Sequence, residues 1–146
     1  MSAKARAAGA VVIFIQHEST SGYLEHGTAQ WQLAHGLHVE PSDIRVRKTT
    51  PDSFHRTELA QILAQRSVNS LVLCGMHTEF CVDTTARRAL ALGFPVVLVE
   101  DAHTTTGNRC LTASQVIRHH NETLSNISSF GPRVRTVSAE RLCIGA

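Results

Sequence analysis

Cys81 stands where a predicted strand turns into a predicted helix, a place at which a cysteine can act as a nucleophile. The apolar run of residues 70–74 predicts a buried strand, and a helix is expected over residues 80–92. Cys81 then lies in the first helical turn, where unpaired backbone N–H groups and the helix dipole stabilise a thiolate. The same N–H groups can bind the oxyanion of a tetrahedral intermediate. From position alone, a small buried structural cysteine is an equally good interpretation.

A lysine at the end of another predicted strand is the second candidate. Residues 44–48 alternate with period 2, so Lys48 shares its face with the apolar Ile44 and Val46, whereas the two arginines of this segment point the other way. A lysine on an apolar face needs a partner or a function, and a nearby cation would stabilise a thiolate further. A surface lysine whose charged end reaches water is the competing interpretation.

The elements that must position these side chains alternate along the chain. Apolar runs predict three strands buried on both faces, at residues 11–15, 70–74 and 95–99, and two further strands are expected at 44–48 and 134–137. Helices are expected at 3–8, 57–66, 80–92 and 111–124, with Thr78 able to cap the third. This alternation favours an α/β fold in three αβα layers, with a mostly parallel, doubly wound (Rossmann-like) sheet of about five strands in a single domain of residues 1–146.

Ligands in such folds bind outside the carboxyl ends of the strands, so four segments are expected to meet. These segments are His17-Glu18, Lys48, residues 75–81 and residues 101–103. The irregular stretch of residues 17–43 contains Trp31 and is long enough to suggest a binding role. Cys74, inside its predicted strand, is expected to belong to the core.

Composition argues against several classes of protein. The 146 residues are 42% hydrophobic and carry a formal net charge of +2 that is spread along the chain, so no nucleic-acid surface is expected. Neither a membrane span nor a signal-peptide pattern is found, which favours a cytoplasmic protein. Four irregularly spaced cysteines predict reduced thiols, and the nine histidines lack metal-site spacing. No metal and no cofactor are therefore expected.

Three segments together carry a family resemblance. Residues 75–87 read Gly-Met-His-Thr-Glu-Phe-Cys-Val-Asp-Thr-Thr-Ala-Arg, residues 48–54 read Lys-Thr-Thr-Pro-Asp-Ser-Phe, and residues 27–31 read Gly-Thr-Ala-Gln-Trp. The first resembles the signature of the isochorismatase-like cysteine hydrolases, the second the family's lysine segment and the third its substrate-side loop. The resemblance covers essentially the whole chain.

The resemblance implies roles for individual residues. Cys81 would be the nucleophile, and Lys48 the cation that stabilises its thiolate and orients the site. A cis peptide bond after Met76 would aim the backbone N–H groups of His77 and Cys81 into an oxyanion hole. A small-molecule substrate and a homo-oligomer are expected, with a substrate pocket that includes Trp31, Glu18, Met76 and Thr78.

One part of the family pattern has no counterpart in this chain. The family's third catalytic residue is an aspartate, usually within Asp-x-Gln, on a strand that lies between those matched by residues 11–15 and 70–74. Three explanations are open: a segment that precedes these residues, direct pairing of the two neighbouring strands, or a strand supplied by a partner chain. In the last two cases another carboxylate, Glu18, Glu79 or Asp101, would have to be the base.

The leading functional hypothesis is hydrolysis of a small amide or related C–N bond through a covalent thioester at Cys81. The alternative chemistry is an isochorismate-type vinyl-ether hydrolase, for which the cysteine is not needed as a nucleophile. An alternative from another class is a catalytically impaired or non-catalytic protein that uses the scaffold for oligomeric binding. A flavodoxin-like cofactor domain is disfavoured, because no phosphate-binding loop follows a strand.

Overall fold

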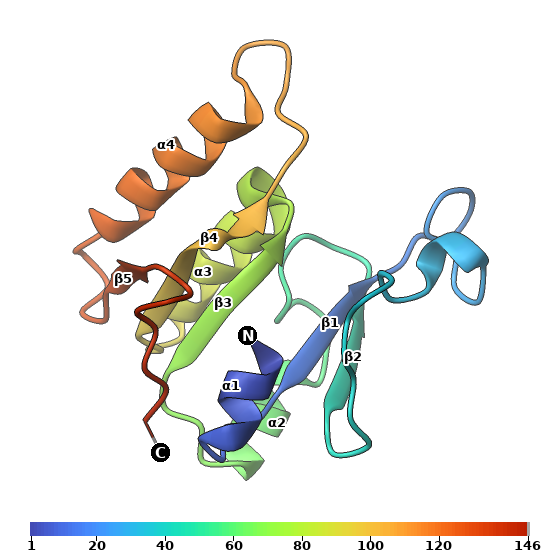
Figure 1. Cartoon of the computed structure of the whole chain (residues 1–146), viewed down its shortest axis with the longest axis horizontal. Helices are drawn as coiled ribbons and strands as arrows, with labels where there is room; N and C mark the ends of the chain where they lie inside the picture. Colours follow the sequence, from blue (N-terminus) through green and yellow to red (C-terminus); the bar gives the residue numbers. More distant parts are fainter. Residues whose placement is uncertain (146) are drawn as a thin grey trace.

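Five strands in two parallel sheets form the frame of the protein, seen in a computed structural model that describes residues 1–145 (Figure 1). The smaller sheet pairs β1 (Ile13–His17) with β2 (Ile44–Lys48), and its register sets His17 beside Lys48. The larger sheet has the order β3-β4-β5, formed by Leu71–Met76, Val96–Thr104 and Val134–Val137. The predicted α/β fold with about five parallel strands is confirmed.

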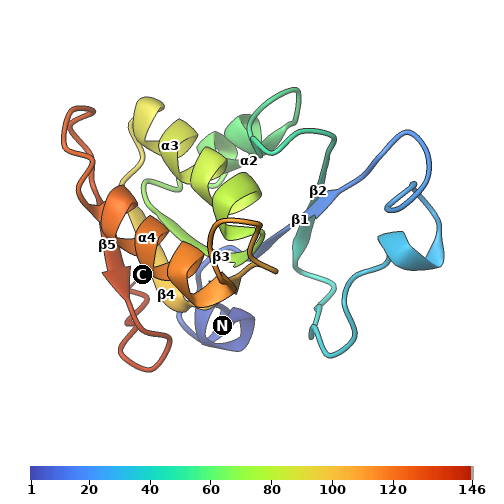
Figure 2. The same cartoon turned by 90° about the horizontal axis from the view of Figure 1, so that it is seen from above.

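Helices lie on both sides of these strands. Figure 2 shows α2 (Leu59–Gln65) and α3 (Asp83–Ala91) on one side and α1 (Ser2–Ala7) on the other, which gives three layers. The fourth helix, α4 (Ala113–Ser125), packs against β4, β5 and α3. It begins two residues later than predicted, because Thr112 and Gln115 form a capping box that fixes its N-terminus.

One hydrophobic core joins the two sheets. Leu63, Leu90, Leu98 and Leu124 are at most 2% exposed and form its centre. The inner faces of β1 and β3 pack against this same cluster through Ile13, Ile15, Leu71 and Leu73. Because close-packed interiors transmit strain, this shared core couples the two sheets.

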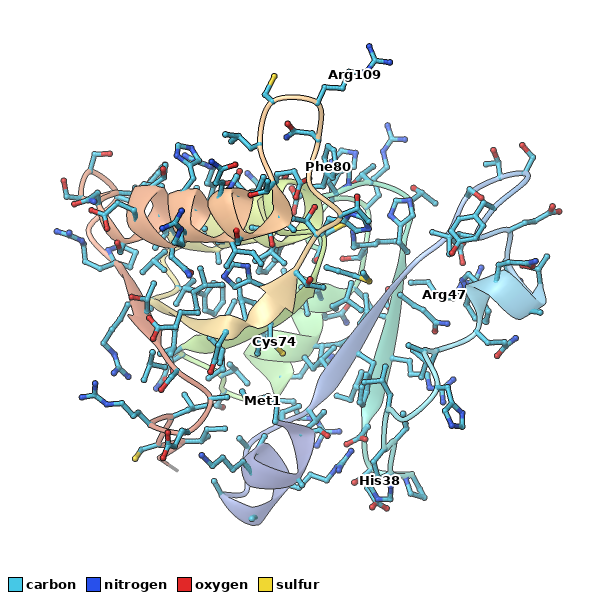
Figure 3. The ribbon with its side chains drawn as sticks, turned by 45° about the horizontal axis from the view of Figure 1, so that its top comes forward. Met1, His38, Arg47, Cys74, Phe80 and Arg109 are labelled. Carbon is cyan, nitrogen blue, oxygen red and sulfur yellow. The ribbon has the colours of Figure 1, made fainter. Side chains whose placement is uncertain are left out.

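The outer face of β3 is open. Leu71 and Leu73 point into the core, whereas the residues between and after them alternate to the opposite face. There Val72 is 39% and Met76 58% exposed, and Cys74 is exposed as well (Figure 3). The predictions that this strand is buried on both faces and that Cys74 belongs to the core are therefore wrong. An apolar run does not reveal whether a second layer covers the strand.

β1 and β3 are not paired with each other. Within residues 1–145, the hydrogen-bonded neighbour of β1 is β2, and that of β3 is β4. Figure 1 shows β1 and β3 side by side with no strand between them. Direct pairing of these two strands is therefore wrong. The edge that each turns to the other keeps backbone N–H and C=O groups that a further strand can bind.

Residues 18–43 form the predicted long connection between β1 and β2. The loop extends away from the rest of the molecule and contains one short 3₁₀ turn, Ala29–Trp31 (η1) (Figure 1). Arg6 of α1 pairs with Asp43 at the end of the loop, and this guanidinium holds the pKa of the Asp43 carboxyl below its usual range. The end of the loop is thereby tied to α1.

Candidate active site

The connection from β3 into α3 builds the site around Cys81. Gly75 has a φ of 126°, which favours glycine, and the Met76–His77 peptide bond is cis, as the resemblance implies. A π-helical turn, Thr78–Val82 (η2), follows, in which the Val82 N–H donates to the His77 carbonyl oxygen at 3.1 Å. Cys81 belongs to this turn and therefore lies at the N-terminal end of α3.

Lys48, the last residue of β2, contacts Cys81 in the turn that follows β3. Its ammonium donates to the Cys81 Sγ atom at 3.1 Å and to the carbonyl oxygens of Thr50 and Pro51 at 2.8 and 3.2 Å. All three N–H bonds of the ammonium are thus used, and the side chain is buried, with the residue 4% exposed. A lysine ammonium against the sulfur is a setting typical of reactive cysteines.

His17 belongs to a segment expected at this edge of the sheet, although the sequence predicts no chemical role for it. It ends β1 in register with Lys48. Burial lowers the pKa of its imidazole from the ordinary value, and the charge on Lys48 lowers that pKa further. Its Nδ1 atom is buried and has no hydrogen-bond partner among the described residues. The position of His17 follows from the parallel register, which places the last residues of two neighbouring strands side by side.

Thr78 begins the turn and Met76 ends β3, and the two side chains differ in their exposure to solvent. Thr78 is fully buried, and its hydroxyl bonds to the His103 imidazole at 2.9 Å. The expectation that Thr78 caps the helix is wrong, since the hydroxyl bonds to His103 and no side chain within residues 1–145 caps the turn. Met76 is more than half exposed beside the cis bond.

Glu18 and Trp31 have other partners than Cys81. Glu18 forms a bidentate ion pair with Arg47, at 2.6 and 3.0 Å. Figure 3 shows Arg47 on the side of β2 that faces away from Phe80. Trp31 accepts a bond from Gln16 Nε2 at its carbonyl oxygen, and its ring packs on His26. The indole Nε1 atom of Trp31 is buried without a hydrogen-bond partner among the described residues. The structure therefore brings Lys48 and Cys81 together, while the pocket roles of Glu18 and Trp31 stay predictions.

The remaining two acidic candidates for the base also have partners. Asp101 accepts a hydrogen bond from the Ala139 N–H at 2.7 Å and so braces the C-terminal segment. Glu79, two residues before Cys81, accepts from the Thr105 hydroxyl at 2.8 Å through Oε1. Its other oxygen, Oε2, is buried and unpaired among residues 1–145.

Neither a membrane-spanning helix nor a metal-binding cluster is found among residues 1–145. No helix within residues 1–145 is long and apolar enough to cross a membrane. In the same range, no three side chains of His, Cys, Asp or Glu stand close enough to hold a metal ion together.

A cavity of about 360 Å³ borders Lys48 on the arginine-bearing side of β2, but Cys81 does not line it.

Comparison with known proteins places this site in a family. A streptothricin hydrolase from Streptomyces noursei is 41% identical over 103 residues, which are 70% of this chain and 41% of that protein. A ureidoacrylate amidohydrolase from Caulobacter vibrioides is 29% identical over 128 residues, covering 67% of this chain and 57% of its own length. The chain thus spans about half the length of the curated relatives it matches.

Solved structures and a family model agree with these relatives. A crystal structure described as an isochorismatase family protein is 37% identical, with a TM-score of 0.83, and covers 94% of this chain and 78% of its own. The model of the isochorismatase domain matches residues 1–131. The chain therefore belongs to the isochorismatase family.

Proposed function

We propose that the protein is a hydrolase that cleaves a C–N bond in a small-molecule amide through a thioester at Cys81. The observation that carries this proposal is the contact of 3.1 Å between the Lys48 ammonium and the Cys81 sulfur at the start of a helix. A relative that is an amidohydrolase supports the choice of an amide. The vinyl-ether alternative would not need an activated sulfur, so the contact favours the amide.

In the proposed reaction, the Cys81 thiolate attacks the carbonyl carbon of the amide and the carbonyl electrons move to oxygen. The backbone N–H groups of His77 and Cys81 stabilise the oxyanion. When the oxyanion collapses, the C–N bond breaks and the nitrogen leaves with a proton, which gives an amine and a thioester. Water then attacks the thioester, which releases a carboxylic acid and regenerates the thiolate.

The two proton transfers need an acid–base group. Glu18 and Asp101 are held by other partners, so neither is a good candidate. We propose that the group is a carboxylate on a further parallel strand between β1 and β3, whose edges are unpaired within residues 1–145. Reading the coding sequence upstream of Met1 for an Asp-x-Gln after an apolar run tests one source, and cross-linking between copies tests a partner chain. If both fail, Glu79 and His17 are the remaining groups beside Cys81 and Lys48.

We also propose that residues 1–146 act as one domain in a cytoplasmic homo-oligomer. The four thiols are free, as a reducing compartment would keep them. Val72 and Met76 on the open face of β3 offer apolar surface to a second copy. Sedimentation of the purified protein would contradict this proposal if it showed a monomer at all concentrations.

Site-resolved alkylation tests the central proposal. The full chain is treated with iodoacetamide at about pH 7, and modification of each cysteine is followed by peptide mass spectrometry. Cys81 is expected to react about tenfold faster than the exposed Cys110 and Cys143, because among the contacts of residues 1–145 it is the Cys81 sulfur that a lysine ammonium meets. Equal rates would end the activated-thiolate proposal. A Cys81→Ala protein with full amidase activity would exclude the thioester.

A further inference from the structure

The carboxyl end of β4 runs beside the turn that holds Cys81. β3 and β4 pair regularly up to Leu73 and Leu98, and the register then shifts so that Gly75 pairs with His103. Between these two pairs β4 advances by five residues while β3 advances by two, so β4 contains a bulge. Beyond the bulge, β4 runs alongside the start of η2. His103 and Thr105 consequently lie next to the first residues of the turn.

A buried polar chain starts at His103. Its Nδ1 atom bonds to the Thr78 hydroxyl at 2.9 Å, and its Nε2 atom bonds to Asn121 Oδ1, also at 2.9 Å. Asn121 in turn donates from Nδ2 to the Glu100 carbonyl oxygen at 3.1 Å. Thr78 is fully buried and His103 is 3% exposed, so water does not compete for their bond.

The amide of Asn121 fixes the direction of every bond in this chain. Because Nδ2 donates to a carbonyl oxygen, Oδ1 is the acceptor, and His103 Nε2 must carry the hydrogen. In the neutral imidazole, Nδ1 is then the acceptor, and the Thr78 hydroxyl donates to it. Asn121 on α4 therefore orients His103, and His103 holds Thr78.

A second bond holds the next residue of the turn. The Thr105 hydroxyl, on a residue 7% exposed, donates to Glu79 Oε1 at 2.8 Å. One side chain of β4 and one just beyond its end thus bind the first two residues of η2, and Phe80 separates this pair from Cys81. The turn is fixed by side chains from a neighbouring strand as well as by its own backbone bonds.

We propose that His103 is a positioning residue for the reaction at Cys81. Through Thr78 it holds the backbone of η2 in the orientation that directs the N–H groups toward the developing oxyanion. The inference rests on the proposed function, and it adds α4 to the apparatus of the site. A purely structural network would hold α4 to the sheet without affecting the oxyanion.

Two reagents separate these roles, because just one of them makes an oxyanion. p-Nitrophenyl acetate acylates Cys81 through a tetrahedral oxyanion: a C–S bond forms, the C–O bond to nitrophenol breaks, and nitrophenolate leaves. Iodoacetamide alkylates the same sulfur by displacing iodide, and no oxyanion forms. The ratio of the acylation rate to the alkylation rate at Cys81 therefore reports on the oxyanion hole, independently of the reactivity of the thiolate.

The experiment measures this ratio in the full chain and in four variants. Thr78→Val removes the hydroxyl at nearly constant shape and is expected to lower the ratio about 10- to 100-fold. Thr78→Ser keeps the hydroxyl and should restore the ratio to within about threefold. Asn121→Leu removes the hydrogen bond between α4 and His103. It should lower the ratio, and it tests the inference even if Thr78→Val does not fold. Thr123→Val, on the same helix but bonded to His119, is the matched control and should change nothing.

The outcomes keep the inference apart from the proposed function. If wild-type Cys81 is alkylated no faster than Cys110, the proposed function fails. If Cys81 is alkylated fast, but Thr78→Val and Asn121→Leu leave the ratio unchanged or slow both reactions equally, the positioning role of His103 is wrong. Fast alkylation without any acylation of the wild-type protein overturns the positioning role as well.

Discussion

The sheet β3-β4-β5 and the long loop of residues 18–43 differ in how their side chains are held. In the sheet, Val96, Leu98 and Val99 are at most 1% exposed, and buried polar bonds tie the end of β4 to η2. In the loop, Tyr23 is 77% and Leu37 50% exposed, and many of its hydrogen bonds span four residues or fewer. The sheet is held by buried side chains, whereas the loop is held mainly by the ion pairs at its two ends.

This difference matches a division of labour between chemistry and recognition. A nucleophile and an oxyanion hole must be held to within a fraction of an ångström, which a packed sheet and helix can do. A loop that packs on little else can change in sequence without loss of the fold, and such loops commonly set specificity. Changes in the two regions should therefore have effects of different kind and size.

The largest effect is expected for Cys81→Ala. Removing the sulfur removes the covalent route, so release of nitrophenolate from p-nitrophenyl acetate should fall by about 10⁴-fold or more. The thermal unfolding midpoint should barely change, because Cys81 is only partly buried. Cys110→Ala, at an exposed thiol on another loop, is the control and should leave the rate unchanged. A Cys81→Ala protein that retains the rate would place the chemistry elsewhere.

The second prediction is that the same substitution lowers the free energy of unfolding far more in the sheet than in the long loop. Leu98→Ala leaves a cavity at a position with no exposed surface and should lower the free energy of unfolding by about 2–5 kcal/mol. Leu37→Ala makes the same chemical change in the loop and should cost less than about 0.5 kcal/mol. Urea unfolding of both variants measures the contrast. Similar losses at the two positions would mean that the loop is as firmly packed as the sheet.

Much of this architecture could be predicted from local patterns. The period-2 alternation around Lys48 correctly indicated an inward-facing side chain, and the strand-to-helix junction correctly placed Cys81 in a first helical turn. Both signals are local, because burial of alternate residues and helix starts leave traces within a few positions.

The interpretations that failed depend on partners far away in sequence. Thr78 has the side chain of a helix cap, but its hydroxyl bonds to His103, 25 residues later, which a register shift in β4 brings alongside. Cys74 sits in an apolar run, yet its exposure depends on whether another layer covers that face of β3. Neither the shift nor the missing cover leaves a trace in the local pattern.

Lys48→Met tests what the buried cation contributes, against a matched lysine at the surface. Without the ammonium, the Cys81 thiolate is less favoured, and alkylation by iodoacetamide at about pH 7 should slow by roughly 10- to 1,000-fold. Lys4 on α1 also donates to three acceptors, but all three are carbonyl oxygens of the C-terminal segment. Lys4→Met should therefore leave the rate at Cys81 unchanged. Equal rates in both variants would show that Lys48 is a structural tie.

The smallest effect is expected at His17, the last residue of β1 before the long loop begins. Because burial and then Lys48 lower the pKa of the folded imidazole below 6.5, the unfolded chain binds this proton first as the pH falls. The contribution to stability is thus complete above about pH 6.5 and is lost as the pH drops toward the pKa of the folded state.

Urea unfolding between about pH 7.5 and pH 5.5 can isolate this contribution. His17→Gln should flatten the loss of stability toward low pH, because glutamine binds no proton in either state. His35→Gln, at an exposed position on the long loop, should leave the slope as it is in the wild type. If His17→Gln and the wild type lose stability in parallel, the protonation of His17 is not coupled to folding, and β1 ends as loosely as the loop that follows it.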